Sequence, residues 1–363
     1  MKIELLGELK TVMSNPHGKH NYFGWPTVCR LQNGKIAAVA SGYRLDHVCP
    51  FGKAVICYSE DEGESFTRPA PVIDTPLDDR DGGIMTFGES GVCVTSFNNS
   101  VEFQRGYAEK YTKNKYSLAY LDTVTEAEEK AALGVTFRIS NDCGVTFGPI
   151  RHSPVTSPHG PNELSDGTVL WVGYTWGWRS TELDGTKLKA YRMDPATGEM
   201  THVGDIPDIP SGISMCEPHM AEASDGTLIT HIRCEDGSNG TTGDKKFTLF
   251  QTESHDGGKT WTAPHQILSN LGGAPAHILR TGSGRLISSY GYRAAPYGIR
   301  MAYSDDCGKT WDFDHEINVN GVTYDIGYPS TVELTDGSFF TVFYAHVEKG
   351  APATILGQRW RFV

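Results

Sequence analysis

Side chains that can transfer protons or bind a polar ligand recur at one place in a repeated segment of this chain. Each copy has an apolar stretch, a tight turn and a second apolar stretch, and the polar residues flank these stretches. Tyr, Glu, Asp, His and Arg are the residue types that act as nucleophiles, acids, bases and donors in pockets. They form one site only if the fold gathers the copies around a common point. These residues are Trp25, Arg44, Asp46, His47, Arg80, Asp81, His159, Glu217, His219, Arg233, His277, Arg293, Arg300, Tyr328 and His346.

Six copies of the segment read as β-hairpins. Each has a turn of the Asp-Gly or Gly type between stretches rich in β-branched and aromatic residues, as in YPSTVELTDGSFFTVFY. That combination is typical of two antiparallel strands joined by a tight turn. The copies begin at Trp25, Arg80, Ser157, Glu217, Ala274 and Tyr328.

A second motif, Ser-x-Asp-x-Gly-x-Ser/Thr-Phe/Trp, occurs four times, out of phase with the hairpins. Its copies are SEDEGESF, SNDCGVTF, SHDGGKTW and SDDCGKTW, which start at residues 59, 140, 254 and 304. Asp and Ser satisfy turn amides, Gly supplies an unusual backbone angle, and the aromatic residue packs between sheets. We therefore interpret the motif as turn chemistry and not as a catalytic site.

A third strand that ends in this motif and a fourth after it turn each hairpin into a four-stranded sheet. Six such antiparallel sheets around an axis predict an all-β, six-bladed β-propeller. We expect residues 1–363 to form a single domain, with a polar insertion at about 98–133 that contains one short helix and extends into solvent. In this topology the polar residues above share one face, and the Ser-x-Asp motifs lie on the opposite face.

Composition excludes several classes of protein. The net charge of −12 argues against a general nucleic-acid or membrane surface, and the charged start MKIELLGELKTV does not resemble a signal peptide. We therefore expect a cytoplasmic location. The eight cysteines form no CxxC pair, so we expect them to be reduced thiols. Neither a metal site nor a cofactor is predicted.

The four motifs and six hairpins resemble those of the sialidase (neuraminidase) superfamily, whose members are six-bladed propellers, and the likeness covers nearly the whole chain. EPHMAEASDGTLITHIR resembles the family segment that supplies a Glu and an Arg, here Glu217 and Arg233. GYPSTVELTDGSFFTVFY resembles the nucleophile segment, here with Tyr328. Arg300 takes the place of a further arginine of the family.

The resemblance implies an exo-acting, retaining glycoside hydrolase that removes a terminal, acidic sugar from a glycan. Tyr328 would be the nucleophile and Glu217 its base, while Arg233 and Arg300 would bind the substrate carboxylate. A neutral phenol suits an anomeric carbon that carries a carboxylate, because a second carboxylate would be repelled. The loop after the first hairpin supplies Asp46 as the expected acid/base, in preference to His47.

One departure from the family pattern concerns the first arginine, whose place is taken by Gly24. Arg44, Arg80 or Arg293 could reach the same spot, and Trp25 could instead stack on a sugar. The loss leaves two alternatives open. One is a glycosidase for a different, non-sialic sugar, and the other is a non-catalytic glycan-binding propeller.

Asp81 and three histidines complete the predicted substrate-binding residues. His159, His219 and His277 follow Pro, Pro and Ala at equivalent places of three copies. Such histidines either hydrogen-bond a strand end or line a sugar site. A histidine metal cluster ranks third, because no carboxylate spacing singles out a metal.

Overall fold

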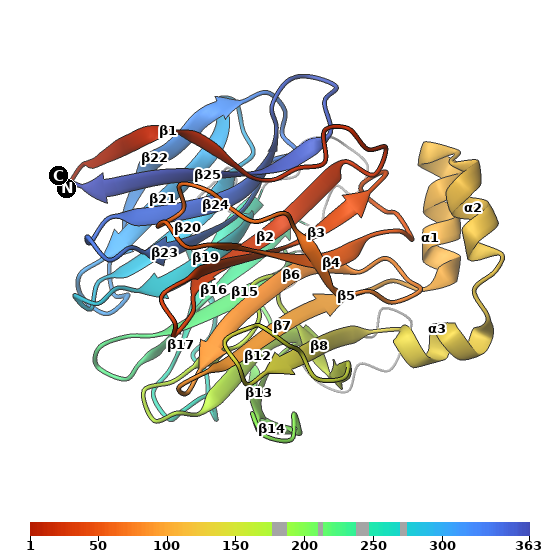
Figure 1. Cartoon of the computed structure of the whole chain (residues 1–363). Helices are drawn as coiled ribbons and strands as arrows, with labels where there is room; N and C mark the ends of the chain where they lie inside the picture. Colours follow the sequence, from red (N-terminus) through yellow and green to blue (C-terminus); the bar gives the residue numbers. More distant parts are fainter. Residues whose placement is uncertain (176–186, 210–212, 237–246, 269–273) are drawn as a thin grey trace.

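The computed structural model describes residues 1–175, 187–209, 213–236, 247–268 and 274–363. They form six antiparallel sheets arranged around a central axis, which confirms the predicted all-β, six-bladed propeller (Figure 1). Each of the six predicted hairpins supplies the inner strands of one sheet. No helix of the described ranges is long and apolar enough to cross a bilayer.

The first three blades follow the order of the chain. The first blade consists of β2 (Tyr22–Arg30), β3 (Ile36–Arg44), β4 (Lys53–Ser59) and β5 (Ala70–Ile73). The second consists of β6 (Arg80–Phe87), β7 (Gly91–Phe97), β8 (Val135–Ser140) and β9 (Arg151–Ser153). The third consists of β10 (Val155–Thr156), β11 (Asn162–Glu163), β12 (Val169–Thr175), β13 (Leu188–Met193) and β14 (Met200–Ile206). In the third blade the inner strand is split into β10 and β11, and both segments pair with β12.

The last three blades include the strand that closes the ring. The fourth blade consists of β15 (Ile213–Glu222), β16 (Leu228–Asp236), β17 (Phe247–Ser254) and β18 (His265–Leu268). The fifth consists of β19 (Ala274–Arg280), β20 (Leu286–Tyr292), β21 (Tyr297–Ser304) and β22 (Asp312–Gly321). The sixth consists of β23 (Gly327–Glu333), β24 (Phe339–His346), β25 (Ala353–Phe362) and β1 (Ile3–Met13). Because β1 pairs with β25, both chain ends belong to one sheet and lie side by side (Figure 1).

The four Ser-x-Asp motifs form turns with one shared hydrogen-bond pattern. In the second copy the Ser140 hydroxyl donates to Asp142 Oδ1 at 2.6 Å, and the Gly144 amide donates to Ser140 Oγ at 2.9 Å. The Thr146 hydroxyl donates to Asp142 Oδ2 at 2.5 Å. Gly144 has φ +79°, a conformation that disfavours other residues. The side chains of the motif are therefore engaged in holding the turn.

The insertion between β7 and β8 contains more helix than the sequence predicted. It forms α1 (Val101–Tyr107), a π-helical turn η1 (Ala108–Thr112), α2 (Lys115–Leu121) and α3 (Glu126–Ala132). The prediction of one helix was wrong because two N-caps were overlooked. Ser100 caps α1 and Asn114 caps α2, whereas the Thr125–Glu128 capping box marks only α3.

The helices stand together at one side of the propeller (Figure 1). The ring of Tyr120 on α2 lies 5.0 Å from the ring of Phe51, and its hydroxyl donates to the carbonyl of Pro76 at 3.3 Å. The insertion therefore packs on loops of the first and second blades and is not simply an excursion into solvent.

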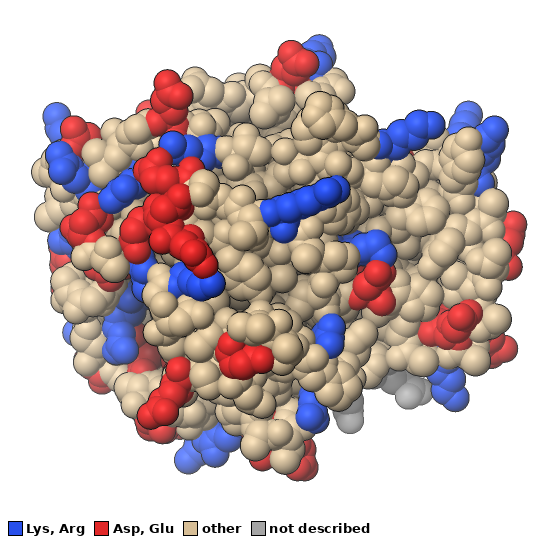
Figure 2. All heavy atoms as spheres, in the orientation of Figure 1, with Lys and Arg blue, Asp and Glu red and all other residues tan. Residues whose placement is uncertain are grey.

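Figure 2 shows Lys and Arg side chains beside Asp and Glu side chains on the face that it draws.

Candidate active site

Four inner strands carry a residue in the left-handed region at a break in their pairing register. These residues are Trp25 (φ 56°), Asp81 (φ 47°), Glu217 (φ 49°) and Tyr328 (φ 51°), and the pairing register shifts at each of them. A bulge re-aims the side chain that it carries, and a positive φ at a residue other than Gly costs free energy that a functional site can justify. Four blades thus use the same backbone device in the inner strand.

Tyr328 and Glu217 form a direct pair. The Tyr328 hydroxyl donates to Glu217 Oε1 at 2.5 Å, and both groups contact the guanidinium of Arg233 on β16. Arg233 Nη1 donates to Glu217 Oε2 and lies 3.2 Å from the phenol oxygen. Its Nη2 donates to Glu235. The structure therefore brings together the three residues that the resemblance selected.

The electrostatics of this pair favour a protonated phenol beside an accepting carboxylate. Burial, and then the negative charge of Glu217, raise the pKa of Tyr328 well above its ordinary value. The Tyr328 ring is only 6% exposed, whereas the Glu217 side chain is 22% exposed. Tyr328 can thus lose its proton only as a new bond forms at its oxygen, and Glu217 is placed to receive that proton.

Asp81 is the other carboxyl at a bulge. It is buried, and burial together with the charge of Glu217 raises its pKa to about 7. Because Asp81 also interacts electrostatically with Tyr328, it belongs to the same cluster. It can switch between a hydrogen-bond donor and an acceptor near neutral pH.

Trp25 lies against the same cluster but is closed to a sugar. It is 2% exposed, its ring centroid lies 6.4 Å from that of Tyr328, and the guanidinium carbons of Arg80 and Arg44 lie 4.1 and 4.9 Å from its own centroid. The predicted stacking of Trp25 on a sugar is therefore not supported, because arginine and protein atoms cover the ring.

Arg44 and Arg80 are both engaged by Asp78. Arg44 is fully buried and pairs with Asp78 Oδ1 at 2.6 Å, while Arg80 contacts Asp78 Oδ2 at 3.3 Å. A Cβ atom at Gly24 would meet the ring of Tyr22 at 3.4 Å. The space beside Gly24 therefore holds an aromatic side chain.

Arg293 and Arg300 are placed differently from the prediction. Arg300 lies in the middle of β21, where it pairs with Asp314 at 3.0 Å and with Glu316 at 3.5 Å on β22, away from the contacts of Tyr328. Arg293, just after β20, has its guanidinium carbon 5.9 Å from the Tyr328 ring centroid. The structure thus brings Arg293 to the nucleophile candidate and leaves Arg300 among the outer strands of its blade.

A network around Asp325 was not found from the sequence. Asp325 accepts hydrogen bonds from Tyr344 at 2.7 Å, from His346 at 2.9 Å and from Tyr22 at 3.4 Å. Although burial opposes it, the hydrogen bonds from His346 and Tyr344 lower the pKa of Asp325 to about 2. Asp325 precedes Tyr328 by three positions in a loop with no motif, and this proximity is the only sequence signal.

Asp46 and His47 lie on the loop after β3. Asp46 is partly exposed and hydrogen-bonds Asn114 of the insertion, and burial raises its pKa. The carbonyl of His47 accepts from Arg44 at 2.8 Å, and its Nδ1 lies 3.2 Å from the Tyr22 hydroxyl. Burial and then Arg80 lower the pKa of His47 to about 3, so the imidazole is neutral.

The insertion also reaches this side of the site. Tyr107, at the end of α1, interacts electrostatically with Arg80, Asp46 and Asp325. It is half-buried, and its ring centroid lies 4.9 Å from that of the exposed Tyr111. The helices therefore border the site beside the loop that carries Asp46.

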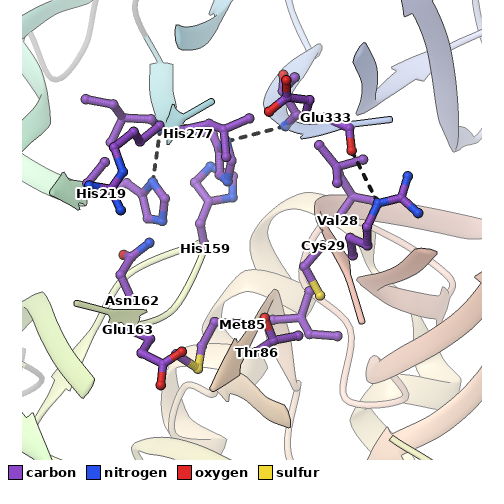
Figure 3. Close-up of a pocket in the computed structure, with 18 of the residues that line it drawn as sticks. Val28, Cys29, Met85, Thr86, His159, Asn162, Glu163, His219, His277 and Glu333 are labelled. Atoms are coloured by element: carbon purple, nitrogen blue, oxygen red, sulfur yellow. Dashed lines mark hydrogen bonds between the residues drawn. The ribbon is translucent and has the colours of Figure 1, made fainter. Parts of the chain in front are cut away.

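The three repeated histidines form a separate cluster in the central channel (Figure 3). Their ring centroids are 4.6 to 5.2 Å apart. His219 Nδ1 accepts from the Ile278 amide at 3.0 Å, and His277 Nδ1 accepts from the Thr331 amide at 3.3 Å. His159 Nδ1 lies 2.9 Å from the Thr27 hydroxyl. His219 and His277 therefore hydrogen-bond amides within the inner strand of the next blade, and not strand ends as predicted.

The same histidines line a cavity of about 630 Å³. It continues past the inner strands to the turn residues Leu334 and Thr335, and Tyr328, Glu217 and Arg233 are not among its lining residues. This cavity is therefore lined by the histidines and not by the Tyr328 pair. Among the described residues, no group of His, Cys, Asp and Glu has the arrangement of a metal site.

Comparisons with known proteins reach this chain through structure alone, because no protein-family model and no curated protein matches its sequence. A protein of unknown function from Dyadobacter fermentans is 20% identical, with a TM-score of 0.76 and 99% of each chain covered. The leech intramolecular trans-sialidase is 14% identical, with a TM-score of 0.65 over 98% of this chain and 70% of its own. An α-L-arabinanase of Penicillium chrysogenum, in complex with arabinobiose, is 14% identical, with a TM-score of 0.61 and 98% of each chain covered. This chain therefore has the six-bladed propeller fold that sialidases and this arabinanase share.

Proposed function

We propose that this protein is an exo-acting, retaining glycoside hydrolase with a tyrosine nucleophile. The observation that carries the proposal is the hydrogen bond of 2.5 Å from Tyr328 to Glu217, with Arg233 bound to both. A nucleophile, its base and a group that orients the base are the parts that covalent catalysis needs. Asp46 is the proposed acid/base.

In the first step the Tyr328 oxygen attacks the anomeric carbon of the terminal sugar. The phenol proton passes to Glu217, the bond from the anomeric carbon to the leaving oxygen breaks, and Asp46 protonates that oxygen. In the second step water attacks the anomeric carbon and gives a proton to Asp46. Tyr328 leaves and recovers its proton from Glu217, so the anomeric configuration is inverted twice and retained.

Arg233 supports both steps without touching the sugar. Its Nη1 holds Glu217 Oε2, which leaves Oε1 facing the phenol. The same nitrogen is 3.2 Å from the Tyr328 oxygen, where negative charge grows as the proton departs. A guanidinium fixed between two carboxylates is already oriented for this task and needs no rearrangement.

The neighbours in structure agree with a saccharide substrate. The leech enzyme was solved with 2,7-anhydro-Neu5Ac and the arabinanase with arabinobiose, so this fold accommodates both a sialic acid derivative and a neutral disaccharide. Fold alone does not decide activity. The choice of sugar therefore has to come from the side chains around Tyr328.

A panel of 4-methylumbelliferyl glycosides, with neutral, deoxy, uronic and sialic sugars, tests the proposal. We expect release from at least one member, loss of release in Tyr328→Phe, and a first-formed product with the substrate's anomeric configuration by proton NMR. Normal release by Tyr328→Phe would contradict the mechanism. Sugar binding without release from any member would favour a glycan-binding propeller.

A further inference from the structure

The flank of Tyr328 carries a carboxylate that can face a substrate. Tyr344 packs beside Tyr328, with 5.9 Å between their ring centroids, and its hydroxyl donates to Asp325 Oδ1 at 2.7 Å. The Asp325 side chain is 27% exposed, so it is not sealed in the core. With a pKa of about 2, it remains ionised at any physiological pH. A fixed negative charge therefore stands next to the position of the proposed reaction.

Arginines near this position already have acceptors in the protein. Arg233 donates to Glu217 and Glu235, and Arg44 and Arg80 share Asp78. Arg293 donates from Nε to the Ile326 carbonyl at 2.9 Å and from Nη2 to the Tyr344 hydroxyl at 3.0 Å. A substrate carboxylate would therefore have to share these guanidinium groups with acceptors of the protein.

The acceptor capacity of Asp325 is only partly used. Tyr344 donates to Oδ1, while His346 and Tyr22 donate to Oδ2. Each carboxylate oxygen can accept two hydrogen bonds, so Oδ1 can take one more. An ionised carboxylate accepts and never donates, so the matching substrate group is a donor such as a sugar hydroxyl. A second carboxylate at this position would meet like charge in a partly desolvated site.

We propose that the terminal sugar is neutral and that one of its hydroxyls donates to Asp325. This inference rests on the proposed function, because it assumes that the sugar sits against Tyr328. It assigns Asp325 as a residue that selects the substrate, and it reverses the expectation of an acidic sugar that the resemblance implied.

The test compares kcat/KM of the wild type and of Asp325→Asn on neutral aryl glycosides, an aryl glucuronide and an aryl α-sialoside. For the wild type we expect a neutral glycoside to exceed both acidic ones by at least about 100-fold. Asn keeps the shape but loses the charge, so we expect a roughly 10- to 100-fold loss on the neutral sugar, mainly through KM. The preference over acidic sugars should shrink by a similar factor.

Asp312→Asn is the matched control. Like Asp325, Asp312 accepts a hydrogen bond from a tyrosine hydroxyl, that of Tyr303, at 2.7 Å, and its Oδ2 lies 3.5 Å from Nε2 of a histidine, His315. Unlike Asp325, it belongs to the outer strand β22. Its replacement should leave all values of kcat/KM unchanged. Tyr344→Phe is a second variant that keeps the Asp325 carboxylate, so discrimination against acidic sugars should survive even if Asp325→Asn folds poorly.

Failure of this inference differs from failure of the proposed function. Release from the α-sialoside that depends on Tyr328 and is unchanged in Asp325→Asn would overturn the inference and leave the mechanism standing. If no glycoside is cleaved, the mechanism falls, and calorimetry with the methyl glycosides then decides. Weaker binding of a neutral glycoside to Asp325→Asn would support the inference. Binding of the methyl sialoside alone, or of neither class, would overturn it.

Discussion

Tyr328 and Glu217 hydrogen-bond across 111 positions of the chain, and each occupies a bulge with a positive φ in an inner strand. The blade repeat supplies the same backbone geometry several times, and the side chain at each bulge sets what that blade contributes. In four blades the bulge thus presents one side chain that is held in place by the sheet behind it.

Replacement of Tyr328 by Phe should abolish turnover and preserve the fold. The variant removes only the nucleophilic oxygen, so we expect kcat to fall by at least about 10³-fold, as for other nucleophile deletions. Tyr303→Phe is the control. Tyr303 also donates to an aspartate, but it lies on β21 and its partner is Asp312 on the outer strand β22. Equal losses in the two variants would show that a structural effect, and not catalysis, is being measured.

Asp46→Asn should reveal general acid catalysis through its dependence on the leaving group. A poor leaving group needs a proton as it departs, whereas 4-nitrophenolate leaves unaided. We therefore expect a loss of about 10²- to 10⁴-fold in kcat/KM for an alkyl or sugar leaving group and a much smaller loss for 4-nitrophenyl. Identical losses for both substrates would remove Asp46 from the role of acid.

The sequence predicted the propeller architecture well because each repeat is defined by residues that are close together in the chain. Asp-Gly turns, alternating β-branched stretches and the Ser-x-Asp motif each act over fewer than about ten residues, so they can be read without knowledge of tertiary contacts. The strand β1 was not assigned, because its pairing with β25 joins residues more than 300 positions apart. The ring closure is a long-range contact that no local pattern encodes.

The site was predicted less evenly, for a similar reason. Tyr328, Glu217 and Arg233 stand in recognisable segments, and the structure places them together. Arg300 was assigned to the further arginine of the family, but its side chain points to acidic partners on the outer strand β22, whereas Arg293 lies beside the Tyr328 ring. Choosing between them requires the side-chain direction along β20 and β21, which depends on register.

Arg233 should be irreplaceable by Lys. Its planar fork contacts Glu217 with one nitrogen and Glu235 with the other, and a lysine ammonium cannot hold both in that geometry. We expect Arg233→Lys to lower kcat by about 10- to 100-fold, and Arg233→Met to lower the free energy of unfolding by about 3–5 kcal/mol, because Glu217 and Glu235 then lose the positive charge that lies between them. Kinetics and urea unfolding measure the two effects. A fully active, fully stable Arg233→Lys would show that charge alone suffices.

The histidine cluster should make the folded protein sensitive to mild acid. Burial lowers the pKa of His277 to about 3, and burial and then His277 lower the pKa of His159 and of His219 well below the ordinary value. In the unfolded chain these groups titrate near 6.5. Below pH 6.5 the unfolded state therefore binds more protons than the folded state, so stability falls as pH falls. The window extends from about 6.5 down to the folded pKa, about 3 for His277.

Urea unfolding of the wild type and of His277→Asn at pH 7 and pH 5 isolates this contribution. Asn can still accept from the Thr331 amide, as His277 Nδ1 does, but it does not titrate. The proton linkage of one such histidine is about 1.4 kcal/mol per pH unit, so the wild type should lose about 2 kcal/mol more than the variant between pH 6.5 and 5. His17→Asn, at an exposed position, should follow the wild type. Parallel losses in the wild type and His277→Asn would mean that His277 takes up its proton over the same pH range in the folded and unfolded states, which would contradict a neutral imidazole in the folded channel.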